Sequence, residues 1–254
     1  VVMFQRSQSA YIDLRGHQVW SVQWRDKGEP VLLLHGGLSS TESWDYAVLP
    51  AVQKTHHPFA YDRSAHGRTG SREGFYHFDF QTDEAIAYIE DVIKGPTHLI
   101  GWSDGGIIAL MVALKRPDLV KSIISIGGNF HHSGVDYEMG EPSVSEEDLA
   151  EYTLVSPDAP HTLLEKVTRM FKVWATEPDI SKQQLAEIQC PVLVVSGDDD
   201  MITLKHTQEL YEALPLGQLA ILPGTSHALV KEKPDLFNAI MMQFLEDLSY
   251  PVTM

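Results

Sequence analysis

The sequence predicts an α/β fold, in which helices cover a mostly parallel β-sheet. Short runs of β-type residues alternate with stretches whose apolar residues have helical spacing, and this alternation is typical of such sheets. Residues 31–34 (Val-Leu-Leu-Leu) form a continuous apolar run that stops at His35-Gly36-Gly37. A run of this kind fits a central strand that is buried on both faces.

The other elements follow in chain order. Residues 11–14 and 19–24 are expected to form an antiparallel pair that turns at Arg15-Gly16. Glycine and proline mark the ends of later elements, because they do not continue a helix or strand. Further strands are expected at residues 58–61, 97–100, 120–126, 191–195 and 218–222, and helices at 80–93, 105–116, 204–213 and 234–248.

The segment between residues 129 and 189 differs in composition from its flanks. It is polar and acidic, as in Glu146-Glu147-Asp148, and it has helical spacing near residues 163–174. We therefore expect residues 1–128 and 190–254 to form the α/β core and residues 129–189 to form a small helical lid. A position over the strand ends is expected for this lid.

Composition limits the classes of partner. The 254 residues carry a formal charge of −16, so nucleic-acid phosphates would be repelled over most approaches. The longest apolar run, residues 107–114, is too short to span a membrane. The first residues lack a signal-peptide pattern, and we expect a cytoplasmic protein. The single cysteine, Cys190, excludes an internal disulfide, and no pattern indicates the oligomeric state.

The strongest local motif is Gly101-Trp102-Ser103-Asp104-Gly105, which matches Gly-x-Ser-x-Gly. Such a serine occupies a sharp turn between a strand and a helix, called a nucleophile elbow, and the glycines prevent clashes there. The bare pattern occurs by chance in many chains. A predicted strand before it and a predicted helix after it make Ser103 the candidate nucleophile.

A serine nucleophile needs a base, and His227 is the preferred candidate. It lies in the loop 223–227, directly after the expected strand at residues 218–222. His35 competes in position, but its glycine-rich turn fits a role in shaping the oxyanion pocket better. The pairs His131-His132 and His56-His57 lack matching ligands at metal-binding spacing, and no metal is expected.

The histidine in turn needs an acid that fixes its tautomer. The sequence Ser196-Gly197-Asp198-Asp199-Asp200 follows a strand and offers three aspartates, among which the residues alone do not decide. The order serine, aspartate, histidine is that of α/β-hydrolases rather than of trypsin or subtilisin.

Acyl transfer also needs donors for the developing oxyanion. The amide of Asp104, which follows the serine, is one candidate. The second is expected from the turn after residues 31–34, with Gly37 as the first choice and Leu38 as the alternative.

At these motifs the chain resembles the α/β-hydrolase superfamily over nearly its whole length. The resemblance rests on residues 32–37, 61–69, 101–105, 197–200 and 224–227. It implies an eight-stranded, mostly parallel sheet, and it selects Asp200 as the acid, three residues after Gly197. Ser64, His66 and Thr69 depart from the usual pattern of the loop that begins at Asp62.

Within the superfamily, residues 101–107 look most like the biphenyl-hydrolase-like branch, which includes α-amino-acid ester hydrolases. In that branch the acid next to the nucleophile is associated with a substrate ammonium group. Asp104 would attract such a cation through a charge-assisted contact. A role of Asp104 toward a turn amide or an arginine is an equal alternative.

The favoured function is a serine hydrolase that cleaves a small carboxylic ester or related acyl compound without a cofactor. Trp44, Trp102, Phe130 and Asp104 are expected in the substrate pocket, although plain packing would also explain the aromatic residues. Hydrolysis of a carbon–carbon bond would keep the same serine. A non-enzymatic small-ligand receptor on this scaffold is a third alternative.

Overall fold

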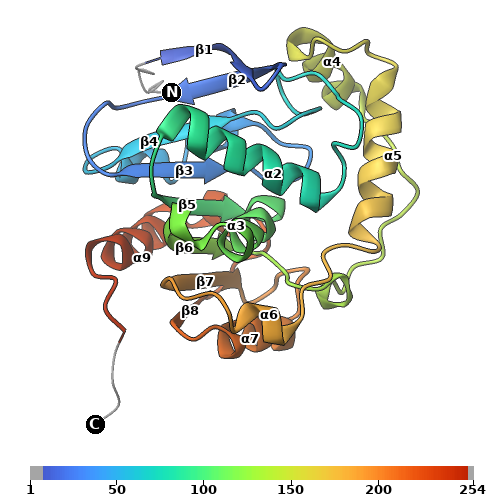
Figure 1. Ribbon diagram of the computed structural model, residues 1–254. Helices are drawn as coiled ribbons and strands as arrows, with labels where there is room; N and C mark the ends of the chain where they lie inside the picture. The colour runs from blue at the N-terminus through green and yellow to red at the C-terminus, as the bar shows by residue number, and fades with distance from the viewer. Residues whose placement is uncertain (1–7, 251–254) are drawn as a thin grey trace.

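A mixed sheet of eight strands forms the centre of the molecule in the computed structural model, which describes residues 8–250 (Figure 1). Its order is β1-β2-β4-β3-β5-β6-β7-β8. The predicted α/β-hydrolase fold is confirmed. The strands are β1 (Gln8–Leu14), β2 (His17–Gln23), β3 (Pro30–Leu34), β4 (His57–Tyr61), β5 (Thr97–Trp102), β6 (Val120–Ile126), β7 (Val192–Gly197) and β8 (Gly217–Leu222).

The six neighbouring strands β4, β3, β5, β6, β7 and β8 are parallel. β2 pairs antiparallel with both β1 and β4. β3 and β5 are in register from Val31 opposite His98 to Leu34 opposite Gly101. Parallel strands in register end at one edge of the sheet. The loops after β3, β5, β7 and β8 therefore meet at the carboxyl edge.

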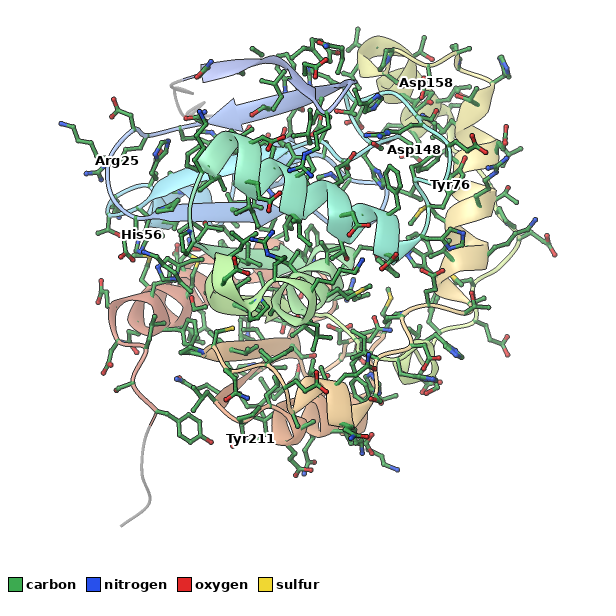
Figure 2. The ribbon with its side chains drawn as sticks, viewed as in Figure 1. Arg25, His56, Tyr76, Asp148, Asp158 and Tyr211 are labelled. Carbon is green, nitrogen blue, oxygen red and sulfur yellow. The ribbon has the colours of Figure 1, made fainter. Side chains whose placement is uncertain are left out.

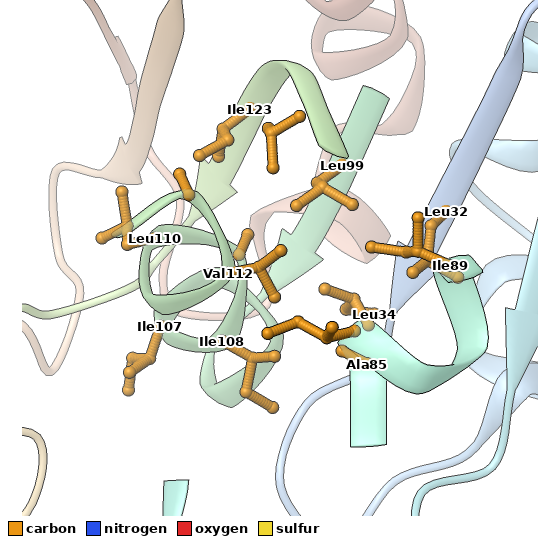
Figure 3. Packing of buried hydrophobic residues seen from close by; sticks show 14 of the residues in the cluster. Leu32, Leu34, Ala85, Ile89, Leu99, Ile107, Ile108, Leu110, Val112 and Ile123 are labelled. Carbon is orange, nitrogen blue, oxygen red and sulfur yellow. The ribbon is translucent and has the colours of Figure 1, made fainter. Parts of the chain in front are cut away.

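Helices cover both faces of the sheet. They are α1 (Leu49–Val52), α2 (Phe78–Tyr88), α3 (Asp104–Lys115), α7 (Leu204–Ala213), α8 (Leu229–Glu232) and α9 (Pro234–Glu246). On one face, α2 and α3 pack on buried residues of β3 and β5 such as Leu32, Leu34 and Leu99 (Figure 3). On the other face, Phe237 and Met241 of α9 join Leu33 and Ile100 in a second core.

The segment between β6 and β7 contains α4 (Glu146–Val155), α5 (Thr162–Trp174) and α6 (Lys182–Leu185). α5 runs along the side of the molecule toward which β3 points, and α4 lies at one end of it (Figure 1). The helix α4 was not expected from the sequence. Ser145 caps it by accepting a hydrogen bond from the Asp148 amide, and Tyr152 is its one buried residue.

Several boundaries differ from the sequence-based expectation, and two of them belong to elements that precede Ser103. The helix expected at residues 80–93 is α2 followed by a π-helical turn, Ile89–Ile93, which ends at Lys94 with φ of 64°. The strand expected at 97–100 continues as far as Trp102. No helix in the described part of the chain is both long and apolar enough to cross a membrane. The amino-terminal residues considered for a signal peptide lie outside the described residues.

Candidate active site

Ser103 occupies the turn between β5 and α3 with a left-handed φ of 55°. The turn is possible because its flanking residues lack side chains. A Cβ at Gly101 would lie 2.1 Å from the Gly105 carbonyl oxygen, and a Cβ at Gly105 would lie 1.9 Å from that of Leu34. The Ser103 amide donates to the Ile126 carbonyl at 2.7 Å, which ties the turn to β6.

The structure brings Ser103, His227 and Asp200 together in one hydrogen-bonded chain. The Ser103 hydroxyl lies 2.9 Å from Nε2 of His227, and Nδ1 of His227 lies 2.8 Å from Oδ1 of Asp200. Because Nδ1–H faces the carboxylate, Nε2 is left to accept the serine proton. These side chains are separated by 97 and 27 positions in the sequence and meet only through the parallel topology.

The three aspartates after β7 have different surroundings. The Asp200 side chain is fully buried, and Oδ1 also accepts the Ile202 amide at 3.0 Å. Asp198 instead accepts the amides of Gly224 and Thr225, at 2.9 and 3.0 Å. Asp199 is exposed. Only Asp200 contacts His227, while Asp198 ties down the loop that carries the histidine.

Trp102 holds the same loop from the other side. Its Nε1 donates to the His227 carbonyl oxygen at 2.9 Å. Trp102 was expected to line the substrate pocket, but it is not among the residues that line the cavity. Its indole instead contacts the loop that carries His227, and Lys231 lies over its ring.

The turn after β3 runs past the candidate nucleophile. A Cβ at Gly36 would lie 3.6 Å from the Ser103 Cβ, and one at Gly37 would lie 2.4 Å from Oδ2 of Asp104. Within residues 8–250, the amides of Gly37 and Asp104 donate to no protein acceptor. Leu38, the alternative, is 41% exposed and has φ of 56°. Gly37 stays the predicted second donor, because its Cα packs against Asp104.

A buried arginine, which the sequence analysis did not single out, supports this turn. Arg63 is fully buried, and its guanidinium donates to the carbonyl oxygens of His35 and Gly36, the latter at 3.1 Å. Its Nε donates to Oε1 of Gln81 at 2.8 Å. The three contacts fix the backbone just before Gly37. The only sequence signal for this role of Arg63 was that the loop beginning at Asp62 resembles a segment of the α/β-hydrolase superfamily.

Asp104 is a buried acid at the wall of the site. Both carboxylate oxygens accept Nε1 of Trp174 from α5, each at 3.1 Å. Burial raises the pKa of Asp104, while the positive charge of Arg63 opposes this rise. Among the described residues, Trp174 is the one hydrogen-bond donor to this side chain, and none forms an ion pair with it.

A cavity of about 410 Å³ is lined by Ser103 and His227 at the sheet edge and by residues of the segment between β6 and β7. Its lining is mostly apolar and includes two members of the candidate triad. Its lining comprises Gly37, Ser103, Asp104, Ile107, Asn129, His132, Val135, Tyr137, Met139, Phe171, Trp174, Ala175, Glu177, Met201, Ile202 and His227.

Two other aromatic residues expected in the pocket do not line this cavity. Trp44 is 1% exposed and belongs to the core beneath the sheet, because the 3₁₀ turn that carries it points inward. Phe130 is buried and stacks on His206 with ring centroids 4.0 Å apart. The aromatic lining comes instead from Phe171, Trp174 and Tyr137, all in the segment between β6 and β7 that the sequence described least well.

Among the described residues, one group of three side chains could share a metal ion: Glu29, His56 and His98. It lies at the amino ends of β3, β4 and β5, away from Ser103. The candidate active site itself contains no such group within the described residues.

Comparison with known proteins agrees with this fold. The family model described as "Alpha/beta hydrolase family" matches residues 31–240, so the chain belongs to the α/β-hydrolase family. The sequence-based assignment to serine hydrolases of this superfamily is confirmed.

Two curated relatives illustrate the range of the similarity. The chain is 24% identical to (E)-2-((N-methylformamido)methylene)succinate hydrolase of Acinetobacter baylyi, over 87% of this chain and 91% of the relative. It is 26% identical to the human serine hydrolase BPHL, over 94% and 86%. Among solved structures, a serine hydrolase involved in carbazole degradation (CarC enzyme) superimposes with a TM-score of 0.77 at 18% identity, covering 95% of this chain and 99% of the other.

Proposed function

We propose that this α/β-hydrolase cleaves a small carboxylic ester, or a related acyl compound, through an acyl-enzyme. The observation that carries the proposal is the continuous hydrogen-bonded chain from Asp200 through His227 to Ser103, which lines a mostly apolar cavity. Among the described residues, the amides of Gly37 and Asp104 donate to no protein acceptor, and the turn that carries Gly37 packs against Ser103 and Asp104.

The proposed reaction has two halves. Ser103 Oγ attacks the acyl carbon while its proton passes to Nε2 of His227, and the carbonyl electrons move onto oxygen. The Gly37 and Asp104 amides stabilise this oxyanion, and loss of one such donor costs on the order of 3 kcal/mol. The imidazolium, stabilised by Asp200, then protonates the leaving alkoxide. Water repeats the sequence on the acyl-enzyme, releases the carboxylic acid and restores Ser103.

The decisive experiment is the Ser103→Ala variant. Without Oγ, we expect loss of p-nitrophenyl acetate turnover and loss of labelling by a fluorophosphonate, with an unchanged circular dichroism spectrum. Ser9→Ala, an exposed serine in β1, serves as the matched control and retains both. Turnover by the Ser103→Ala protein at the wild-type rate would remove Ser103 from the mechanism.

The cavity supports a substrate with a small acyl group and, as a second proposal, one that carries an ammonium group. The buried Asp104 carboxylate is aimed at the space beside Ser103 and has Trp174 as its hydrogen-bond donor. Asp104→Asn keeps the shape and removes the charge. We expect it to raise KM for an aminoacyl ester and to leave KM for the matched neutral ester nearly unchanged.

The alternatives predict other outcomes of the same assays. A carbon–carbon hydrolase would turn over a vinylogous diketone, such as a substituted dienoate, faster than any ester in the panel. A small-ligand receptor would undergo one slow turnover and retain its product. Rapid, repeated ester turnover supports the esterase proposal against both.

A further inference from the structure

The amino edge of the sheet carries a second polar cluster that the proposed reaction does not use. Glu29 precedes β3, His56 precedes β4 and His98 is the second residue of β5. β4, β3 and β5 are neighbours in the sheet. One ligand atom from each of the three side chains lies within 4.8 Å of the other two. His56 lies on the side of the molecule opposite Asp148 of the lid segment (Figure 2).

Both histidines are held in place by hydroxyl groups on Nδ1. The Thr55 hydroxyl is hydrogen-bonded to Nδ1 of His56 at 2.8 Å, and the Ser122 hydroxyl to Nδ1 of His98 at 2.7 Å. A neutral ring whose Nδ1–H donates to its hydroxyl carries a lone pair on Nε2. In metal sites, the histidine nitrogen that does not bind the metal usually donates a hydrogen bond of this kind, and that bond orients the ring. His98 takes the Nδ1–H tautomer when it gives up the hydrogen bond in which its Nε2–H donates to Oε2 of Glu29.

The Nε2 atom of His98 faces the space that the three side chains share. Nε2 of His98 lies 2.8 Å from Oε2 of Glu29. Within the described residues, Nε2 of His56 has no hydrogen-bond partner, and the ring lies edge-on to His98 with centroids 5.6 Å apart. His56 and His98 are buried, whereas the Glu29 side chain is 58% exposed, which gives an ion access from solvent.

We propose that Glu29, His56 and His98 form a binding site for one Zn²⁺ ion. Two imidazole nitrogens and one carboxylate oxygen are a ligand set that Zn²⁺ accepts, with water as the fourth ligand. Ligand distances near 2 Å require the hydrogen bond between His98 and Glu29 to open by a small movement. The ion would join the amino ends of three adjacent strands.

Lys121 competes with the ion for Glu29. Its Nζ is 2.9 Å from Oε1 of Glu29, and its side chain is 33% exposed. Removing this ammonium group would free the carboxylate and lower the positive potential at the cluster. The proposal therefore predicts opposite effects for neighbouring residues: loss of His56 or His98 weakens Zn²⁺ binding, and Lys121→Met strengthens it.

The site also lies far from the proposed chemistry. His98 precedes Ser103 by five positions along β5, a separation of about 16 Å at the rise of a strand. Zn²⁺ binding should therefore raise thermal stability without being required for turnover. At about one hundred times its Kd, the ion should raise Tm by about 5–10 °C.

The test is calorimetric titration of the untagged, metal-free protein with Zn²⁺, and with Co²⁺ as a spectroscopic substitute. We expect one ion per chain and d–d absorption bands of a four-coordinate Co²⁺ site. His98→Ala and His56→Ala should each weaken binding at least about tenfold. His131→Ala removes another histidine–carboxylate pair, with Asp179 at 3.4 Å, and should bind as wild type.

Glu29→Gln, at an exposed position outside the strands, keeps the test valid if His98→Ala fails to fold. Zn²⁺ binding that is absent, or unchanged in His56→Ala and Glu29→Gln, would overturn the proposal. So would a lack of effect from Lys121→Met on the Kd. None of these outcomes depends on esterase activity.

Discussion

Ser103 has a backbone conformation that residues with a side chain rarely adopt, with φ of 55° and ψ of −118°. Such conformations cost about 1–3 kcal/mol and persist where the surrounding structure enforces them. Here the tie to Ile126 and the packing of Gly101 against Gly105 enforce the turn. The hydroxyl is thereby presented at the carboxyl edge at the expense of stability.

This strain predicts a difference between two inactive variants. Ser103→Gly should be more stable than Ser103→Ala by about 1 kcal/mol, because glycine reaches a positive φ without a Cβ penalty and part of this gain is offset by its greater freedom when unfolded. Urea denaturation of both variants measures the difference. Equal stability, or a more stable alanine variant, would show that the turn is not strained.

The choice of Asp200 among three aspartates leads to a second prediction. Asp200→Asn should lower kcat by about 10³–10⁴-fold, because the amide no longer favours the tautomer that accepts the serine proton. Asp199→Asn, at an exposed neighbouring position, is the matched control and should remain near the wild-type rate. A similar loss in both variants would argue against Asp200 as the acid.

Sequence reasoning could name Ser103 and His227 because each follows a predicted strand, whereas Asp200 was selected among three aspartates by the family resemblance. It placed Trp44 and Phe130 wrongly because the pattern shows that a side chain is apolar but not toward which side of the sheet it points. Arg63 escaped notice because a buried arginine looks like a surface one in sequence. Its role depends on carbonyl groups that only the folded turn directs at it.

At the scale of elements, the turn between β3 and the 3₁₀ turn Thr41–Trp44 depends on Arg63 for its shape. We predict that Arg63→Lys lowers kcat for esters by about 10–100-fold with little change in KM. An ammonium group lacks the fork that contacts two carbonyls at once, and an oxyanion donor acts on the transition state rather than on the bound substrate.

Steady-state kinetics with p-nitrophenyl acetate tests this prediction. A change in KM alone, with kcat preserved, would indicate that Arg63 shapes the pocket and does not position the oxyanion donors. Urea denaturation of the variant shows whether the fold is retained, since a guanidinium that is fully buried also contributes to stability.

The helix α5 divides the space above the sheet edge. Phe171 lines the 410 Å³ cavity over Ser103 and also an outer cavity of about 640 Å³ beside α4. Phe171 is therefore a residue that the walls of the two cavities share. Phe171→Ala should join them and raise kcat/KM for a hexanoyl ester relative to an acetyl ester by about tenfold, because added methylene groups gain apolar contacts.

A series of p-nitrophenyl esters of increasing chain length measures this preference. Leu164→Ala, at a half-exposed position of the same helix, provides the control and should keep the wild-type profile. An unchanged profile in Phe171→Ala would mean that the outer cavity does not receive the acyl chain.

The elements of the sheet and its flanking helices were more predictable than those of the segment between β6 and β7, for a physical reason. Strands buried on both faces, such as β3 and β7, need continuous apolar runs, and these are visible in sequence. The helix α4 buries only Tyr152, so it has little apolar periodicity and was missed. α5 buries Val167, Met170 and Val173 at helical spacing and was predicted within one residue at its start.

At the scale of the whole molecule, the parallel topology sends two polar clusters to opposite edges of one sheet. β5 connects them, with His98 near its start and Ser103 directly after its end. Sequence alone could place each cluster's members at strand ends. It did not associate His98 with His56 and Glu29, because their proximity follows from the strand order β4-β3-β5, which no local pattern encodes.

The molecule also buries histidines away from the proposed triad, and these determine a pH dependence of its stability. Burial lowers the pKa of His66 to about 3 and that of His206 to about 4, from an ordinary value of 6.5. His206 is 6% exposed, and its Nε2 accepts the Phe130 amide at 3.2 Å, which requires the neutral ring.

Between pH 6.5 and 4 the unfolded chain therefore binds protons at these histidines that the folded chain does not bind. The free energy of unfolding must fall as the pH falls through this range, and it is restored above pH 6.5. At about 1.4 kcal/mol per pKa unit, His206 alone contributes up to about 3 kcal/mol to this loss. Urea midpoints measured from pH 4 to 7.5 should show the slope, and His206→Gln should reduce it. A slope that His206→Gln leaves unchanged would mean that His206 is protonated in the folded protein at pH 5, contrary to its acceptor role toward Phe130.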